Sequence, residues 1–192
     1  MVLVTRTYAD HWDGQAREPV PKDVPILCQP EDEAAVFGAG FAHVSSVAPE
    51  AEWDGLRFAR TGGRHATGEI GAQVDPVSCL VVVRAEGSPS PYVAGDTIWC
   101  DEAEEALRTN PDVIIANAGA AQFLEGGPIT MTAGDVARGC RAATGARVIV
   151  VHMDAINHCL PTRRELAQEL GEQGLAGKAE MSTDGETLET SA

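Results

Sequence analysis

The sequence predicts a layered α/β domain, and three observations support this. Short apolar runs typical of strands alternate with helix-like segments along the whole chain. Of the 192 residues, 44% are hydrophobic and 22% charged, so a core of normal size can form. Two helix starts carry the capping-box pattern, at Thr132–Asp135 and Thr162–Glu165. A chain of this length fits one domain with at most a small appendage.

The predicted strands are apolar runs that end at turn-forming residues. In chain order they are residues 2–4, 26–28, 41–47, 56–59, 79–83, 91–94, 113–116 and 148–151. The valine-rich run at 79–83 has no polar residue, which is typical of a strand buried on both faces.

Helices are predicted from Pro30, over residues 101–108, and after Thr132 and Thr162. In the last of these, Leu166 and Leu170 form the apolar face. From Gly171 the chain is rich in glycine, serine, threonine and glutamate and poor in apolar residues. We therefore expect a domain over residues 1–170 and a flexible acidic tail over residues 171–192.

The charge balance restricts the partners. The chain has 14 basic and 29 acidic residues, a net charge of −15. Such a surface repels phosphate backbones and anionic lipid, so we expect no nucleic-acid and no membrane partner, whereas metal cations and a small-molecule substrate remain compatible. The five cysteines form no CxxC pair and the first residues do not resemble a signal peptide, so a cytoplasmic location is expected.

Polar residues that follow predicted strands are the candidates for chemistry. Asp10 and His11 follow the first strand, Asp96 lies in a Gly-Asp-Thr turn, and His152 follows the strand that ends at residue 151. His65 lies in a glycine-rich loop. Loops at one edge of a layered α/β sheet are the usual ligand site, and imidazoles with carboxylates suit zinc or a similar divalent metal. Each residue taken alone is compatible with a structural role, His65 most readily.

These motifs resemble a known family. Residues 2–14 are similar to the metallo-β-lactamase signature, an apolar strand followed by T-H-x-H-x-D-H-x-D, and residues 92–97 are similar to its Y-x-x-G-D-T segment. The order that follows, Gly127-Pro128 before a helix and a strand ending at His152, resembles the lactonase-like branch, which hydrolyses sugar-phosphate lactones and related esters. The resemblance covers residues 1–170 and implies a four-layer αββα sandwich.

The resemblance fails at two metal ligands. The first two histidines of the signature fall on Arg6 and Tyr8, which with His65 would correspond to the ligands of a first metal. Arginine cannot ligate a cation, and tyrosine ligates only as a phenolate. We therefore expect the first metal site to be impaired.

The second metal site keeps its residues. By the resemblance, Asp10, His11 and His152 would ligate it, with Asp96 as the bridging carboxylate, so one zinc ion is expected, or another divalent metal in its place.

The signature also begins almost at Met1, whereas strands precede it in the family. We expect a fragment of a longer protein or a fold without its opening strands. An uncovered edge in the second case would favour a homo-oligomer or instability.

The resemblance implies hydrolysis of an ester, lactone or related substrate by a zinc-bound water, which Asp10 and Asp96 would orient. Two interpretations of the altered ligands stay open. Either Arg6 replaces the charge of the absent metal and Tyr8 donates to an oxyanion, or both have drifted in a catalytically silent scaffold. His43, within a predicted strand, is expected to be structural; for His158 a local structural role is weighed against entry into the site.

Overall fold

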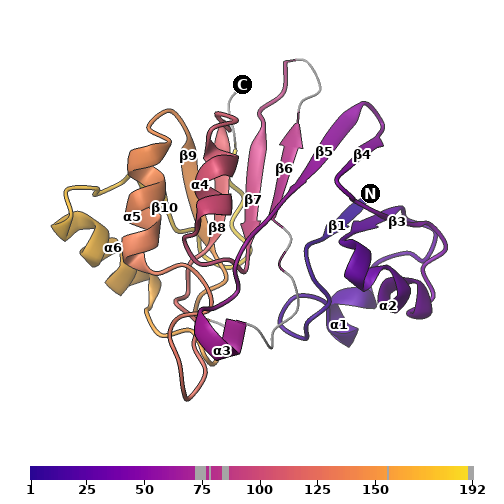
Figure 1. Cartoon of the computed structure of the whole chain (residues 1–192), viewed down its shortest axis with the longest axis horizontal. Coiled ribbons are helices and arrows are strands. Elements are labelled where there is room, and N and C mark those ends of the chain that lie inside the picture. Colours follow the sequence, from indigo (N-terminus) through magenta and orange to yellow (C-terminus); the bar gives the residue numbers. More distant parts are fainter. Residues whose placement is uncertain (72–76, 78, 84–86, 155, 190–192) are drawn as a thin grey trace.

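Figure 1 shows the computed structural model, which describes residues 1–71, 77, 79–83, 87–154 and 156–189. The smaller of its two sheets has three parallel strands in the order β1 (Val2–Val4), β2 (Ile26–Cys28) and β3 (Val44–Ser46). Within the described residues, β1 and β3 are therefore the two edges of this sheet.

The larger sheet has seven strands in the order β10-β9-β8-β7-β6-β5-β4. Its strands are β4 (Glu50–Trp53), β5 (Leu56–Thr61), β6 (Cys79–Val83), β7 (Pro91–Gly95), β8 (Val113–Asn117), β9 (Arg147–Val151) and β10 (Ala179–Glu180). The four strands from β7 to β10 are parallel, and the pairs β7–β6, β6–β5 and β5–β4 are antiparallel. The carboxyl ends of β7, β8 and β9 consequently lie side by side.

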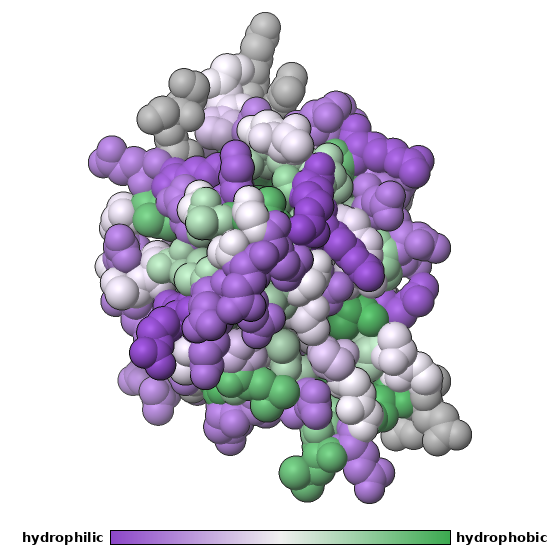
Figure 2. Space-filling view, turned by 90° about the vertical axis from the view of Figure 1, so that its left-hand side faces the viewer, coloured by the Kyte–Doolittle hydropathy of each residue, from purple (hydrophilic) through white to green (hydrophobic). Residues whose placement is uncertain are grey.

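Helices cover the outer faces of both sheets. They are α1 (Gly14–Arg17), the 3₁₀ helix η1 (Pro30–Asp32), α2 (Glu33–Gly38), α3 (Gly68–Gly71), α4 (Asp101–Leu107), α5 (Ala133–Ala142) and α6 (Arg163–Glu172). Helices α4, α5 and α6 pack on one face of the larger sheet (Figure 1). The surface over α6 is mostly hydrophilic, with small hydrophobic groups toward its lower edge (Figure 2). None of the helices in the described part of the chain is long and apolar enough to span a membrane.

Successive side chains of β2 point to opposite faces of the small sheet, one face toward α2 and the other toward the larger sheet. Ile26 and Cys28 face α2 and pack with Val36 and Phe41. Leu27 points the opposite way and packs with Phe58 of β5. Alternation along the strand thus buries both faces of the small sheet. The resulting order of layers, helix–sheet–sheet–helix, confirms the predicted αββα sandwich.

Strong local signals predicted most elements well. Both predicted capping boxes are present: the Thr132 and Thr162 hydroxyls accept from the backbone N–H groups of Asp135 and Glu165. Strand β4 was not predicted, although the Asp54-Gly55 turn that joins it to β5 has positive φ at both residues, as a tight hairpin turn requires. The predicted strand over 41–47 is shorter, and the burial expected for the side chains of 79–83 lies outside the described residues.

The expected flexible tail needs a correction. After α6 the chain returns to the sheet, and β10 pairs in parallel with β9. Ala179 is buried in the main core, and the Glu180 carboxylate forms an ion pair with Arg147 of β9. The sequence does not predict β10, because a strand of only two residues carries almost no apolar pattern. Residues 190–192 of the expected tail lie outside the described residues.

Candidate metal centre

Four side chains meet where β1, β7 and β9 end. Asp10 and His11 lie in the turn after β1, Asp96 follows β7, and His152 follows β9. One possible ligand atom from each lies within 4.8 Å of the others. The structure therefore brings together the four residues expected at the second metal site, from segments up to 142 positions apart in the chain.

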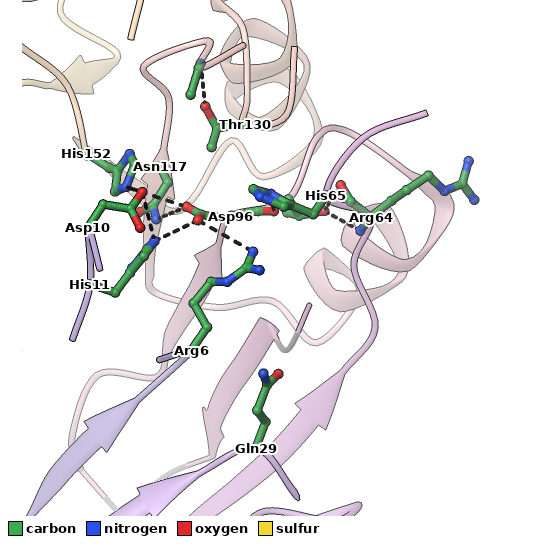
Figure 3. Close-up of polar contacts among 12 residues, drawn as sticks. Arg6, Asp10, His11, Gln29, Arg64, His65, Asp96, Asn117, Thr130 and His152 are labelled. Atoms are coloured by element: carbon green, nitrogen blue, oxygen red, sulfur yellow. Dashed lines mark hydrogen bonds and ion pairs between the residues drawn. The ribbon is translucent and has the colours of Figure 1, made fainter. Parts of the chain in front are cut away.

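Asp96 is the centre of this group (Figure 3). Its Oδ2 lies 2.7 Å from Nε2 of His11, and its Oδ1 lies 3.9 Å from Nε2 of His152. On the outer side, Oδ2 of Asp10 lies 3.4 Å from Nε2 of His152 and 3.9 Å from Nε2 of His11. The two imidazole rings stack with their centroids 4.9 Å apart. This gives two imidazole and two carboxylate donors around one point.

Asp96 is kept ionised by its partners. Burial of this side chain, which is 2% exposed, would by itself raise its pKa. The hydrogen bond and charge of His11, followed by His152 and Asn117, outweigh burial and hold the pKa of Asp96 well below its ordinary value. The carboxylate is therefore charged at neutral pH and able to hold a cation.

The donor set fits a divalent metal. His152 Nε2 is buried and has no hydrogen-bond partner among the described residues, although it faces the carboxylates of Asp10 and Asp96. Buried polar atoms are normally satisfied, so an imidazole nitrogen in this state is explained by a ligand that accepts its lone pair. Two histidines and two carboxylates are donors that zinc takes in proteins.

Asn117 belongs to the site and was not among the sequence candidates. It is the last residue of β8, and its Nδ2 donates to Oδ1 of Asp96 at 2.7 Å. The amide thus fixes the orientation of the carboxylate. Its sequence signal was the same one that identified Asp96 and His152, a polar residue at the end of a buried strand.

His65 lies close to Asp96 but outside the four-residue group. Its Nδ1 is 2.8 Å from the backbone carbonyl oxygen of Asp96. Burial, and then the positive charge of Arg6, lower the pKa of His65. The ring is therefore neutral and engaged by the backbone.

Arg6 and Tyr8 lie on the same side of Asp96 as His65. The Arg6 guanidinium carbon lies 3.6 Å from the centre of the Tyr8 ring, and Nη1 of Arg6 lies 3.7 Å from Oδ2 of Asp96. The centroids of the Tyr8 and His65 rings are 6.5 Å apart. The three residues that align with the family's first-site ligands thus lie close together beside Asp96.

A cavity of about 380 Å³ opens on the group, and a second cavity also borders it. This first cavity, the loop cavity, is lined by Tyr8, Ala9, Asp10, His65, Asp96, Phe123, Ile129, Thr130, His152 and His158. The second, of about 450 Å³, is lined by the polar residues Asp10, His11, His152 and Arg163 and by strand residues such as Val93, Ile115 and Val151.

Two further residues, His158 and Cys159, lie near the site. His158 lines the loop cavity with Nε2 4.0 Å from Oδ2 of Asp10, so it enters the site rather than packing away from it. Burial and the charges of Asp96 and Asp10 raise the thiol pKa of Cys159 to about 11, so the thiol is protonated at neutral pH. His43 is exposed in the loop before β3 and not within a strand as expected.

The four-layer fold, with imidazole and carboxylate donors gathered at its strand ends, defines a protein of the metallo-β-lactamase fold class. YhfI of Bacillus subtilis, a solved metallo-beta-lactamase fold protein, shares this fold at 13% identity and a TM-score of 0.69, over 97% of this chain and 76% of YhfI. No family model matches the chain.

Sequence comparison gives the family. The UPF0173 protein YddR of Bacillus subtilis (strain 168) is 32% identical over 188 residues, which are 97% of this chain and 74% of YddR. The chain therefore belongs to the UPF0173 family, and it spans about three quarters of the length of this relative.

Two solved structures are similar in sequence as well as in fold. An isothiocyanate hydrolase from Delia radicum gut bacteria is 33% identical with a TM-score of 0.90, over 99% of this chain and 76% of that protein. A protein described as a possible metal-dependent hydrolase from Veillonella parvula DSM 2008 is 31% identical with a TM-score of 0.91, over 97% of this chain and 74% of that protein. One of these two relatives is thus named a hydrolase and the other a possible metal-dependent hydrolase.

Proposed function

We propose that this protein hydrolyses a small uncharged substrate, an ester, lactone or related electrophile, at one divalent metal ion held by Asp10, His11, Asp96 and His152. The observation that carries the proposal is the convergence of these four donors within 4.8 Å around a buried imidazole nitrogen that lacks a hydrogen-bond partner among the described residues. Zinc is the proposed ion because imidazole and carboxylate donors both suit it. When bound, such an ion supplies Lewis-acid chemistry and lowers the pKa of water.

The protein groups divide the remaining work. His11 and His152 are proposed to hold the ion, and Asn117 keeps the Asp96 carboxylate in its orientation. Asp10 is the more exposed of the two carboxylates and lines the loop cavity. It is therefore proposed to accept a proton from the attacking water, with His158, 4.0 Å away, as the next group toward solvent.

The loop cavity supports an uncharged substrate. Its described lining contains no lysine or arginine side chain that could pair with a phosphate, and it presents Asp10 and Asp96. The net charge of −15 also repels anions as they approach. Phe123 and Ile129 provide an apolar wall. A sugar phosphate is thus a poorer fit than an apolar ester, a lactone or an isothiocyanate, the substrate in the name of the relative from Delia radicum gut bacteria.

Metal content and hydrolysis measured on the same samples test this function. The purified full chain is loaded with Zn²⁺, dialysed, and assayed with a p-nitrophenyl ester, a γ-lactone and benzyl isothiocyanate. The wild-type chain is expected to retain an ion and to hydrolyse at least one substrate. His152→Ala and Asp10→Ala should each lose most of the ion and the activity, whereas the exposed control His43→Ala should keep both.

Two results would contradict the proposal. Equal metal retention in all four proteins would exclude these ligands. Retained metal with no hydrolysis of any of the three substrate types would favour the second candidate, a catalytically silent scaffold, which is supported by the replacement of two family ligands by Arg6 and Tyr8.

A further inference from the structure

The Arg6 side chain is buried in an unusual state. It is 2% exposed, and none of its three guanidinium nitrogens has a hydrogen-bond partner among the described residues. Arginine stays protonated, and a buried charge is costly unless it is compensated. The compensation available in the described structure is the Asp96 carboxylate, at 3.7 Å, together with the face of the Tyr8 ring.

Asp96 therefore lies between two positions for positive charge. Arg6 approaches its carboxylate from one direction, while Asp10, His11 and His152 gather on another side (Figure 3). Both directions converge on Oδ2, which lies 2.7 Å from His11 and 3.7 Å from Arg6. The Arg6 guanidinium thus occupies one of these two positions permanently, because it is part of the protein.

The Arg6 side offers no complete set of ligands for an ion among the described residues. The guanidinium has no lone pair to donate, and its carbon lies against the Tyr8 ring at 3.6 Å. Nδ1 of His65 is already directed at the backbone carbonyl oxygen of Asp96, 2.8 Å away. A cation on this side would lie beside a fixed positive charge in a buried setting, where the repulsion is weakly screened.

The charges of the site agree with a single ion. Metal ligands bind in their deprotonated forms, so two carboxylates, two neutral imidazoles and the Arg6 guanidinium together would carry a net charge of −1 around a bound ion. One divalent ion changes this to +1. A second would raise it to +3 beside the buried side chains of Arg6 and Asp96.

We infer that Arg6 is the second cation of this centre, a built-in charge that takes the position of a second metal ion, holds Asp96 in place and limits the protein to one divalent ion. This inference rests on the metal site of the proposed function. It makes Arg6 a positioning residue, since its nitrogens are covered and do not reach the loop cavity.

Zn²⁺ titration of the metal-free full chain, followed by calorimetry and elemental analysis, tests the inference. The wild-type chain is expected to bind one ion. Arg6→His with Tyr8→His supplies two ligands and removes the charge, so this double variant should bind two. The matched control, Arg6→Met with Tyr8→Phe, removes the charge without adding ligands, and should bind one ion at least tenfold more tightly. Arg6→Lys keeps the charge and should stay within threefold of wild type.

Each other outcome overturns the inference. Two ions, or none, in the wild-type chain would do so, as would a folded double-histidine variant that binds one ion. If that variant does not fold, the matched control decides: unchanged or weaker binding after Arg6→Met with Tyr8→Phe excludes a competing cation. Two ions in the wild type, with hydrolysis, would refute this inference and leave hydrolysis at the metal centre standing. One ion without hydrolysis would refute only the proposed function, and no ion would refute both.

Discussion

Replacing Asn117 by leucine tests whether Asp96 works as an oriented ligand. The two side chains have similar volume, but leucine cannot donate the 2.7 Å hydrogen bond from Nδ2 to Oδ1 of Asp96. Both groups are buried, and hydrogen bonds to a charged partner contribute roughly 1.5–3 kcal/mol. We therefore expect the metal-free Asn117→Leu protein to lose about that much free energy of unfolding.

The effect on metal binding is separate and more informative. Groups that orient a metal ligand typically contribute 10- to 100-fold to metal affinity, roughly 1.4–2.8 kcal/mol. Zn²⁺ affinity of the Asn117→Leu protein should fall by about that factor, because Asp96 is then free to rotate and its pKa rises when one donor is lost.

Urea unfolding of the metal-free protein and competition titration of Zn²⁺ against a chelator measure the two effects. His43→Ala, an exposed change outside the site, should alter neither. If the Asn117→Leu protein loses stability but its Zn²⁺ affinity stays within threefold of wild type, Asp96 is not a metal ligand and the reasoning fails.

Three further predictions follow from other contacts. Gly119→Ala should weaken Zn²⁺ binding and cost about 1–3 kcal/mol of stability, because a Cβ there would meet the Cys159 sulfur and lie 2.5 Å from the His152 carbonyl oxygen; unchanged binding in a titration would show that this loop tolerates the change. The pKa of His65 is lowered below its ordinary 6.5, so as the pH falls below 6.5 the unfolded chain takes up a proton that the folded chain does not, and stability falls by up to about 1.4 kcal/mol per pH unit. Urea unfolding of the metal-free protein between pH 7 and 5 should therefore show a shallower loss for His65→Gln than for wild type, and parallel curves would argue against a neutral buried ring. Thr162→Ala should cost about 1 kcal/mol in thermal unfolding, since it removes the hydroxyl that accepts from Glu165, while Thr183→Ala provides a comparison at an exposed turn where little loss is expected.

Local signals explain why much of the fold was predictable. The capping boxes at Thr132 and Thr162 act within one helical turn, so sequence spacing alone identifies α5 and α6. Strands β8 and β9 are buried and read as apolar runs. Strand β4 and the two-residue β10 lack such a pattern, because their place depends on pairing with β5 and β9.

The site was predictable only in part, for a related reason. Asp10, His11, Asp96 and His152 stand at strand ends, and parallel strands bring their carboxyl ends together. Asn117 also stands at the end of a strand, but its uncharged side chain does not mark it as a metal ligand in the sequence. The state of Arg6 depends on how Tyr8 and Asp96 pack around it, which no spacing in the sequence specifies.

Anomalous diffraction at the zinc edge, from crystals of the Zn²⁺-loaded full chain, tests the central claim most directly. The account predicts one peak, within bonding distance of Asp10, His11, Asp96 and His152, with the Arg6 guanidinium still beside Asp96 and no peak between Tyr8 and His65. Two peaks on either side of Asp96, or a single peak on the Arg6 side, would contradict it.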